Sequence, residues 1–162
     1  MKMVTREEII ETWDRLCALD EKQSATLSKK FLEAQPALGV YLLASTEDLG
    51  EEAAESPLVE LVLAVWEVMT RVAGAPLKNL APETIETAEE ANISALQNLE
   101  SASEFQWHDA ASGLIGCFNQ REILGFCIEV LMADNEEQPE LAPERIGMEM
   151  IVLKTVIDCL DQ

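Results

Sequence analysis

The chain is poor in positive charge. Its 162 residues include 11 lysines and arginines against 31 aspartates and glutamates, so the formal net charge is -20. The imbalance begins after residue 35: residues 1–35 carry 6 basic and 7 acidic side chains, a net charge of -1, whereas residues 36–162 carry 5 and 24, a net charge of -19. A surface this negative repels nucleic acid and anionic membranes. It favours a protein partner with a basic surface, or it simply keeps the protein in solution as a solvated acidic face.

Histidine is scarce, and the cysteines are dispersed. His108 is the only histidine, and no C-x-x-C pair occurs among the four cysteines, which are Cys17, Cys117, Cys127 and Cys159. A zinc site needs closely spaced cysteines and histidines, and a di-iron bundle needs two Glu-x-x-His motifs. We therefore expect no metal site and no cofactor, and we expect the cysteines to behave as small buried side chains.

One acidic segment resembles a calcium-binding loop only at its start. Asp134 opens a run of alternating oxygen-bearing side chains. However, Pro139 stands where the loop requires glycine, and Arg145 stands at the position of the final glutamate. The pattern therefore predicts an acidic surface loop over residues 134–142 and no calcium site.

Long hydrophobic runs are absent as well. The longest run of strictly apolar or small residues, 110–118, is far shorter than the ~20 residues that a membrane-spanning helix needs. The first ten residues lack the apolar core of a signal peptide. The expected location is therefore the cytoplasm, with no membrane contact.

The strongest positive signal is the segment 57–73, which reads PLVELVLAVWEVMTRVA. It does not alternate and is too long for a typical strand, so a helix is predicted. Apolar residues cover most of its circumference, and Glu60, Glu67 and Arg71 fall on one narrow stripe. Such a helix must be covered by several neighbours. We therefore place it at the centre of a bundle, with the stripe exposed and Glu67 paired with Arg71.

Short capping patterns place the first helices. Thr5 with Glu8, and Asp20 with Gln23, have the spacing of two capping boxes. They predict two N-terminal helices, which we expect to pack together as an antiparallel hairpin. Ser56 is the expected N-cap of the central helix, because it directly precedes a proline at the first helical position.

The remaining helices follow from apolar periodicity and from the positions of proline and glycine. Gly74 is expected to end the central helix, and 45–56 is expected to be a surface loop. Further helices are predicted over 37–44, 82–103, 123–133 and 143–160. The fold class is therefore all-α: a single helical bundle of about six helices forming one domain, residues 1–162.

A weak internal repeat is present. The sequence LAPETI at 80–85 matches LAPERI at 141–146. If the match reflects duplication, the chain contains two related helical hairpins, 58–104 and 122–161, in addition to the N-terminal hairpin. The alternative is chance, because proline and glutamate are both common at helix starts.

The polar junction between these two units holds the candidate ligand-binding residues. Trp107, His108 and Asp109 lie within the segment 105–118, and a seam between two hairpins is a natural place for a ligand groove. Cys117 is nine residues beyond His108, or ~13.5 Å along one straight helix, so the two do not form a local catalytic pair. No catalytic residue is assigned. The alternative reading of His108 is a junction or helix-cap residue with no chemical role.

Two hypotheses of function result. The first is an acidic interaction protein of the adaptor, chaperone or inhibitor type that binds a basic protein partner. The alternative is a small-molecule-binding or enzymatic helical bundle with its site near 105–118. A homodimer is a third hypothesis, formed through an uncovered strip of the central helix or of 123–133.

Overall fold

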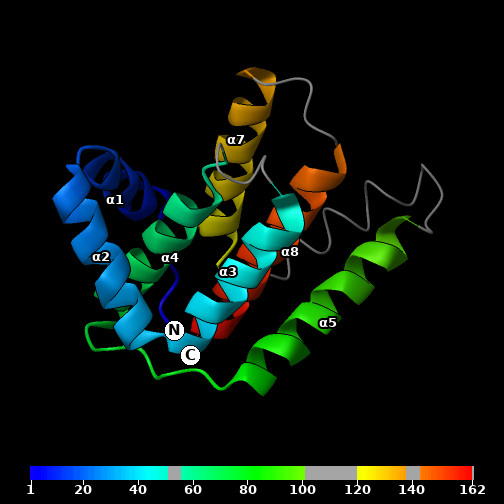
Figure 1. Ribbon diagram of the computed structural model, residues 1–162, viewed down its shortest axis with the longest axis horizontal. Coiled ribbons are helices and arrows are strands. Elements are labelled where there is room, and N and C mark those ends of the chain that lie inside the picture. Colours follow the sequence, from blue (N-terminus) through cyan, green and yellow to red (C-terminus); the bar gives the residue numbers. More distant parts are fainter. Residues whose placement is uncertain (51–55, 101–119, 138–142, 162) are drawn as a thin grey trace.

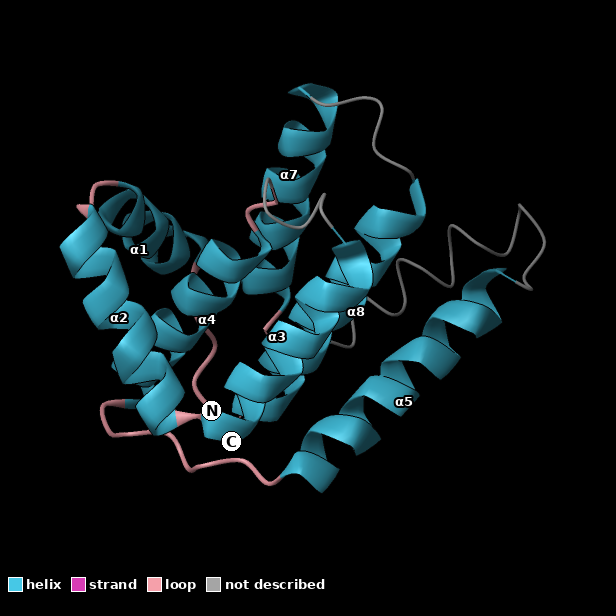
Figure 2. Ribbon diagram, in the orientation of Figure 1, coloured by secondary structure: helices cyan, strands magenta, loops and turns pink. Residues whose placement is uncertain are grey.

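The computed structural model describes residues 1–50, 56–100, 120–137 and 143–161. These ranges contain seven helices and no strand, so the predicted all-α bundle is confirmed (Figures 1 and 2). None of the described helices combines the length and the apolarity that crossing a bilayer requires. The helices are α1 (Arg6–Cys17), α2 (Glu21–Ala34), α3 (Pro36–Leu49), α4 (Leu58–Ala73), α5 (Pro82–Glu100), α7 (Arg121–Glu137) and α8 (Pro143–Leu160).

Helix α4 lies in the core, as its sequence predicts. None of its large apolar side chains is exposed, and it packs against α1, α2, α7 and α8. The Oγ atom of Ser56 accepts a hydrogen bond from the Leu58 N–H at 3.1 Å, so the expected N-cap residue does cap the helix. Gly74 ends the helix with a φ of 67°, a left-handed conformation that favours glycine. Because no apolar strip of α4 is uncovered, a dimer through this helix is not supported.

Helix α8 shares the central position, which the sequence did not predict. It packs against α3, α4, α5 and α7. The expected stripe includes Leu153, Ile157 and Leu160, and all three side chains are buried. The burial extends further round the helix than that stripe, to Val152, Thr155, Val156 and Cys159. The core therefore has two central helices, not one.

The two predicted capping boxes are present, but the N-terminal hairpin is not tightly packed. Both boxes have reciprocal hydrogen bonds, which begin α1 at Thr5 and α2 at Asp20. The two helices then find different main partners: α1 packs against α4 and α7, and α2 packs against α3 and α4. The reason is that Ile9 and Leu16, the buried apolar residues of α1, belong to the core around α4.

The polar stripe of α4 contacts α1. The predicted ion pair between Glu67 and Arg71 is therefore wrong. The carboxylate of Glu67 lies 2.6 Å from the guanidinium of Arg15 on α1, and it does not pair with Arg71. Arg71 instead donates a hydrogen bond to the main-chain carbonyl of Glu8, at 2.9 Å. Ala64, on the same stripe, is fully buried. The stripe is therefore partly an interface between α1 and α4.

Two helices are longer than predicted. Residues 45–49 continue α3, and Asp134 to Glu137 continue α7, although both segments were predicted to be loops. In α3, the hydroxyls of Ser45 and Thr46 donate to main-chain carbonyls one turn earlier, and Gly50 ends the helix with a φ of 74°. These polar segments lack an apolar period, so the sequence pattern did not show that the helices continue.

The two repeat units are not packed alike. Both matching segments start a helix at their proline, Pro82 in α5 and Pro143 in α8. However, α7 packs directly against α8, whereas the main partners of α5 are α8 and α3. The two units are therefore packed differently in the described residues, and the duplication itself stays a prediction. What the two segments share is a proline at the start of a helix.

Two buried glutamines hold chain segments that have no regular structure. The side chain of Gln35 donates to the Lys78 carbonyl at 2.9 Å and accepts from the Leu80 N–H at 3.2 Å. Gln120 accepts from the Val4 N–H at 3.0 Å and donates to Asp161 at 2.9 Å. The first glutamine fixes the connection from α4 to α5. The second joins the two ends of the described chain, which lie side by side in Figure 1.

Candidate functional site

The candidate ligand residues Trp107, His108 and Asp109 lie in the range 101–119, outside the described residues. The hypothesis of a groove at 105–118 therefore stays a prediction. The described ranges contain three other features that bear on function. They are a buried cluster of charged side chains, an open pocket, and a helix face that carries only negative charge.

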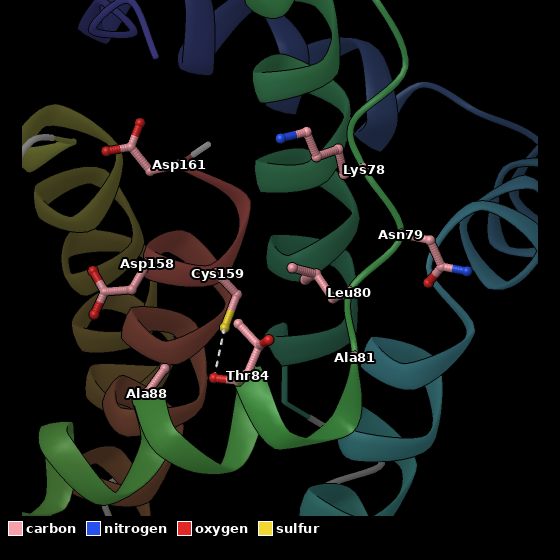
Figure 3. Close-up of a pocket in the computed structure, with 9 residues that line it drawn as sticks. All are labelled: Lys78, Asn79, Leu80, Ala81, Thr84, Ala88, Asp158, Cys159 and Asp161. Atoms are coloured by element: carbon pink, nitrogen blue, oxygen red, sulfur yellow. Dashed lines mark hydrogen bonds between the residues drawn. The ribbon is translucent and has the colours of Figure 1, made fainter.

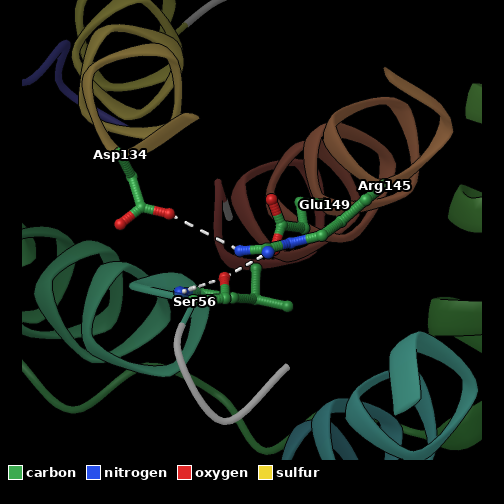
Figure 4. Close-up of polar contacts among 5 residues, drawn as sticks. Ser56, Asp134, Arg145 and Glu149 are labelled. Carbon is green, nitrogen blue, oxygen red and sulfur yellow. Dashed lines mark hydrogen bonds and ion pairs between the residues drawn. The ribbon is translucent and has the colours of Figure 1, made fainter. Parts of the chain in front are cut away.

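The buried cluster joins the ends of three helices (Figure 4). Arg145 and Glu149 lie one turn apart near the start of α8, with 6% and 1% of their surface exposed, and Arg145 Nε is 2.9 Å from Glu149 Oε1. The second guanidinium nitrogen, Nη2, lies 3.5 Å from a carboxylate oxygen of Asp134 in α7. The Ser56 hydroxyl, at the start of α4, donates to Glu149 and accepts from Leu58.

Two residues of this cluster belong to the segment that resembles a calcium-binding loop. Asp134 is the first residue of that resemblance and Arg145 the last, and the structure brings the two into contact as an ion pair. Within the described residues, Arg145 Nη1 is buried without a hydrogen-bond partner. The cluster therefore acts as a polar connection that fixes the ends of α4, α7 and α8 relative to one another.

Sequence reasoning missed this cluster, although part of its signal was local. Arg145 and Glu149 are four residues apart, which is the spacing of an ion pair on a helix. Such pairs are usually exposed, so the spacing alone does not predict burial. Ser56 and Glu149 are separated by 93 residues, so their contact depends on the packing of the whole bundle.

An open pocket of about 450 Å³ lies between the 78–81 segment, the start of α5 and the end of α8 (Figure 3). Its charged lining side chains are Lys78, Asp158 and Asp161. Both carboxylates already have partners, because Asp158 pairs with Lys154 and Asp161 accepts from Gln120. The volume suits a small ligand, but both carboxylates of the lining are engaged within the protein.

The thiol of Cys159 also lines this pocket, and its environment does not favour catalysis. Burial, followed by the nearby Asp158 carboxylate, raises the pKa of Cys159 to about 11. At neutral pH the residue is therefore a thiol and not the thiolate that a nucleophile requires. In the described part of the chain, no three histidine, cysteine, aspartate or glutamate side chains are grouped as a metal site needs.

The outer face of α5 carries acidic side chains and no basic one. The helix contains no lysine or arginine. Glu83, Glu86 and Glu90 follow one another at spacings of three and four residues, so they share one stripe, and all three are exposed. Ile93 continues the same stripe and is 37% exposed. The ion pairs found within the described ranges use none of these carboxylates.

The described part of the inner face of α5 is attached to the bundle by a buried isoleucine and by polar contacts. Ile85 is its only described side chain that is fully buried. The Tyr41 hydroxyl of α3 donates to Glu89 at 2.8 Å, and Asn92 donates to Thr155 of α8 at 3.1 Å. Burial, together with the Glu89 carboxylate, raises the pKa of Tyr41, so its hydroxyl stays a donor. Within its described side chains, α5 therefore contributes Ile85 to the core and is held to α3 and α8 by polar contacts.

Comparison of the chain with protein-family models, with curated proteins and with solved structures finds no match.

Proposed function

We propose that the chain is a protein-interaction module that binds a basic partner protein through the outer face of α5. The observation that supports this most is the uncompensated stripe of Glu83, Glu86 and Glu90, which ends in the exposed side chain of Ile93. Carboxylates flanking an apolar side chain complement a partner segment that carries lysine or arginine beside apolar residues. Opposite charges of this kind increase the rate of association and select the partner.

The charge of the stripe is more than helix formation requires. A glutamate in the first turn of a helix is favourable because it faces the positive end of the helix dipole, and this accounts for Glu83. Glu86 and Glu90 lie four residues apart, where like charges destabilise a helix by a few tenths of a kcal/mol. A basic partner would remove this repulsion, so the helix gains from being bound.

Helix α1 provides a matched control. It carries three exposed acidic residues, Glu7, Glu11 and Asp14, at helical spacings of four and three. In contrast to α5, it also contains Arg6 and Arg15, which form ion pairs with Glu129 and Glu67. Neutralising either set of three carboxylates changes the net charge equally, but only the α5 set belongs to the proposed binding face.

The test measures binding of a synthetic amphipathic helix of lysine and leucine by fluorescence anisotropy. We expect the variant E83Q/E86Q/E90Q to bind this peptide about tenfold more weakly than the unmodified chain, which corresponds to ~1.4 kcal/mol. The control E7Q/E11Q/D14N should change the affinity less than twofold. Replacing Ile93 by serine should weaken binding in addition, and high salt should weaken the binding of the unmodified chain.

Equal losses in the two triple variants would contradict the proposal. They would show that the peptide responds to net charge and not to the face of α5. Absence of binding at both low and high salt would contradict it as well. Circular dichroism of each variant verifies that the helical fold is retained.

A further inference from the structure

A separate apolar surface lies where α2 meets α3. The three most exposed large hydrophobic side chains of the described residues are all found there: Val40 at 70%, Leu43 at 61% and Leu32 at 51%. Val40 and Leu43 are three residues apart on α3, and they point away from the buried face formed by Leu38 and Leu42. Exposed apolar side chains are ordinary when scattered, but a group of this kind marks an interaction site.

A glycine allows α2 and α3 to approach each other closely at this place. Gly39 is buried, and the end of the Leu32 side chain lies directly over it, in the space that a Cβ atom would fill. Leu43 is one helical turn beyond Gly39 on the same face. Leu32 of α2 is thereby brought next to the exposed apolar face of α3, and the three side chains form one patch, the α2–α3 patch.

The charges around the patch have opposite signs on its two sides. Lys22 and Lys29 are exposed and seven residues apart, so they form one stripe along α2. Lys29 has a weak, exposed ion pair with Glu33, 3.8 Å away. On the other side, Glu47 and Asp48 are exposed on α3, which contains no basic residue. The patch therefore lies between a basic arm and an acidic arm.

We propose that the α2–α3 patch is the interface of a homodimer with twofold symmetry. In such a dimer the two patches face each other, and the symmetry places the basic arm of each copy opposite the acidic arm of the other. Glu47 is ~10 Å along α3 from Val40, and the midpoint of Lys22 and Lys29 is also ~10 Å along α2 from Leu32. The two arms are therefore at comparable distances from the apolar centre. An apolar centre with a charged rim is the usual anatomy of a protein interface.

The net charge of α2 and α3 is low enough for two copies to meet at this face. Two chains of charge -20 repel one another, but screening limits the effect to charges within ~8 Å at physiological salt. Helix α2 contains three lysines and two glutamates, a net charge of +1, and α3 contains two acidic residues and no basic residue, a net charge of -2, so the two helices together carry only -1 of the total charge. The face is distinct from the outer face of α5, so the dimer does not rest on the proposed binding of a basic partner.

Sedimentation equilibrium of the full chain over a range of concentrations tests the dimer. We expect a reversible dimer for the unmodified chain and a shift to monomer, at least tenfold in dissociation constant, for V40E/L43E. The control M148E places a charge on an exposed apolar residue of α8, outside the α2–α3 patch, and should leave the equilibrium unchanged. A chain that stays monomeric at every concentration would overturn the proposal, and so would a dimer that V40E/L43E does not weaken.

Charge reversal tests the arrangement of the two arms. The variants K22E/K29E and E47K/D48K should each be monomeric on their own. In a dimer of either variant, like charges would face each other at both contacts between the arms. Mixing the two variants should restore association as a heterodimer, since each arm then faces the opposite charge. The two chains are distinguished by a mass tag in native mass spectrometry. If both variants stay dimeric alone, or if the mixture stays monomeric, the proposed twofold arrangement is wrong.

Discussion

The guanidinium of Arg145 and the carboxylate of Glu149 are buried together, 2.9 Å apart, one turn from each other on α8. Both charges have lost their water, and Glu149 is further bound by the hydroxyl of Ser56 at the start of another helix. A buried pair of this kind contributes little relative to well-packed apolar residues, but removing one partner leaves the other charge buried and unpaired. The position of α8 against α4 and α7 therefore depends on both residues being present.

We predict that E149Q destabilises the fold by about 3 kcal/mol, because a neutral amide replaces the nearer carboxylate and the buried Arg145 charge then has only the longer ion pair with Asp134. The double variant R145M/E149L should be less destabilised than E149Q, since it removes both charges and keeps the volume filled. Urea unfolding followed by circular dichroism measures both. The exposed pair of Lys29 and Glu33 is the control, and E33Q should cost less than about 0.5 kcal/mol. A double variant less stable than E149Q would contradict the interpretation.

Two glycines should respond to alanine with opposite signs. Gly74 has a φ of 67°, a conformation that costs other residues about 1–2 kcal/mol, so G74A should destabilise the end of α4 by that amount. Gly125 lies within α7, and a Cβ atom added there meets no other atom within 4 Å. G125A should therefore stabilise the protein by up to about 1 kcal/mol. Thermal unfolding distinguishes the two, and a change of the same sign in both would show that backbone conformation is not the cause.

Cys127 and Cys159 are buried as predicted, but Cys17 is exposed, so the prediction of burial is wrong for Cys17 and the cysteines should differ in reactivity. Burial raises the pKa of Cys127 to about 12 and that of Cys159 to about 11, against an ordinary value of 9.0, whereas Cys17 is exposed. In the variant C117S, we expect a thiol reagent at pH 8 to modify Cys17 rapidly and to modify Cys127 and Cys159 only after unfolding. The additional substitution C17S should remove the rapid phase. A rapid phase that persists would mean that Cys127 or Cys159 is accessible.

The same two thiols predict a dependence of stability on pH. The folded state holds both protons more tightly than the unfolded chain does, since the folded pKa values are raised. Their contribution to stability is therefore complete below pH 9 and is lost as the pH rises from 9 towards 11 and 12. Unfolding measured at pH 8 and pH 10 should show the loss, and the loss should be smaller in C127A/C159A than in the unmodified chain.

The local parts of the fold were predictable because their causes are local. Each capping box is made by two side chains three residues apart, so Thr5 with Glu8 sufficed to begin α1. Pro143 likewise marked the start of α8. The run of apolar residues in α4 required coverage on most sides, whatever the neighbours were.

The parts that failed depend on partners distant in the sequence. Nothing near Glu67 indicated that Arg15 would bind it in place of Arg71. The burial of α8 was underestimated because Thr155 and Cys159 are weak hydrophobic signals, and the charges of Arg145 and Glu149 suggested exposure. The glutamates of α5 are visible in the sequence, but their spacing alone does not distinguish a binding face from acidic residues that favour a helix start.

The amide of Gln120, which bonds to Val4 and Asp161 together, has a practical consequence. A short glycine-rich linker between the first and last described residues would close the polypeptide into a ring without distorting the bundle. New ends opened in the ring at Gly50 or Gly74 would give circular permutants. The rearranged molecules should refold to the same architecture.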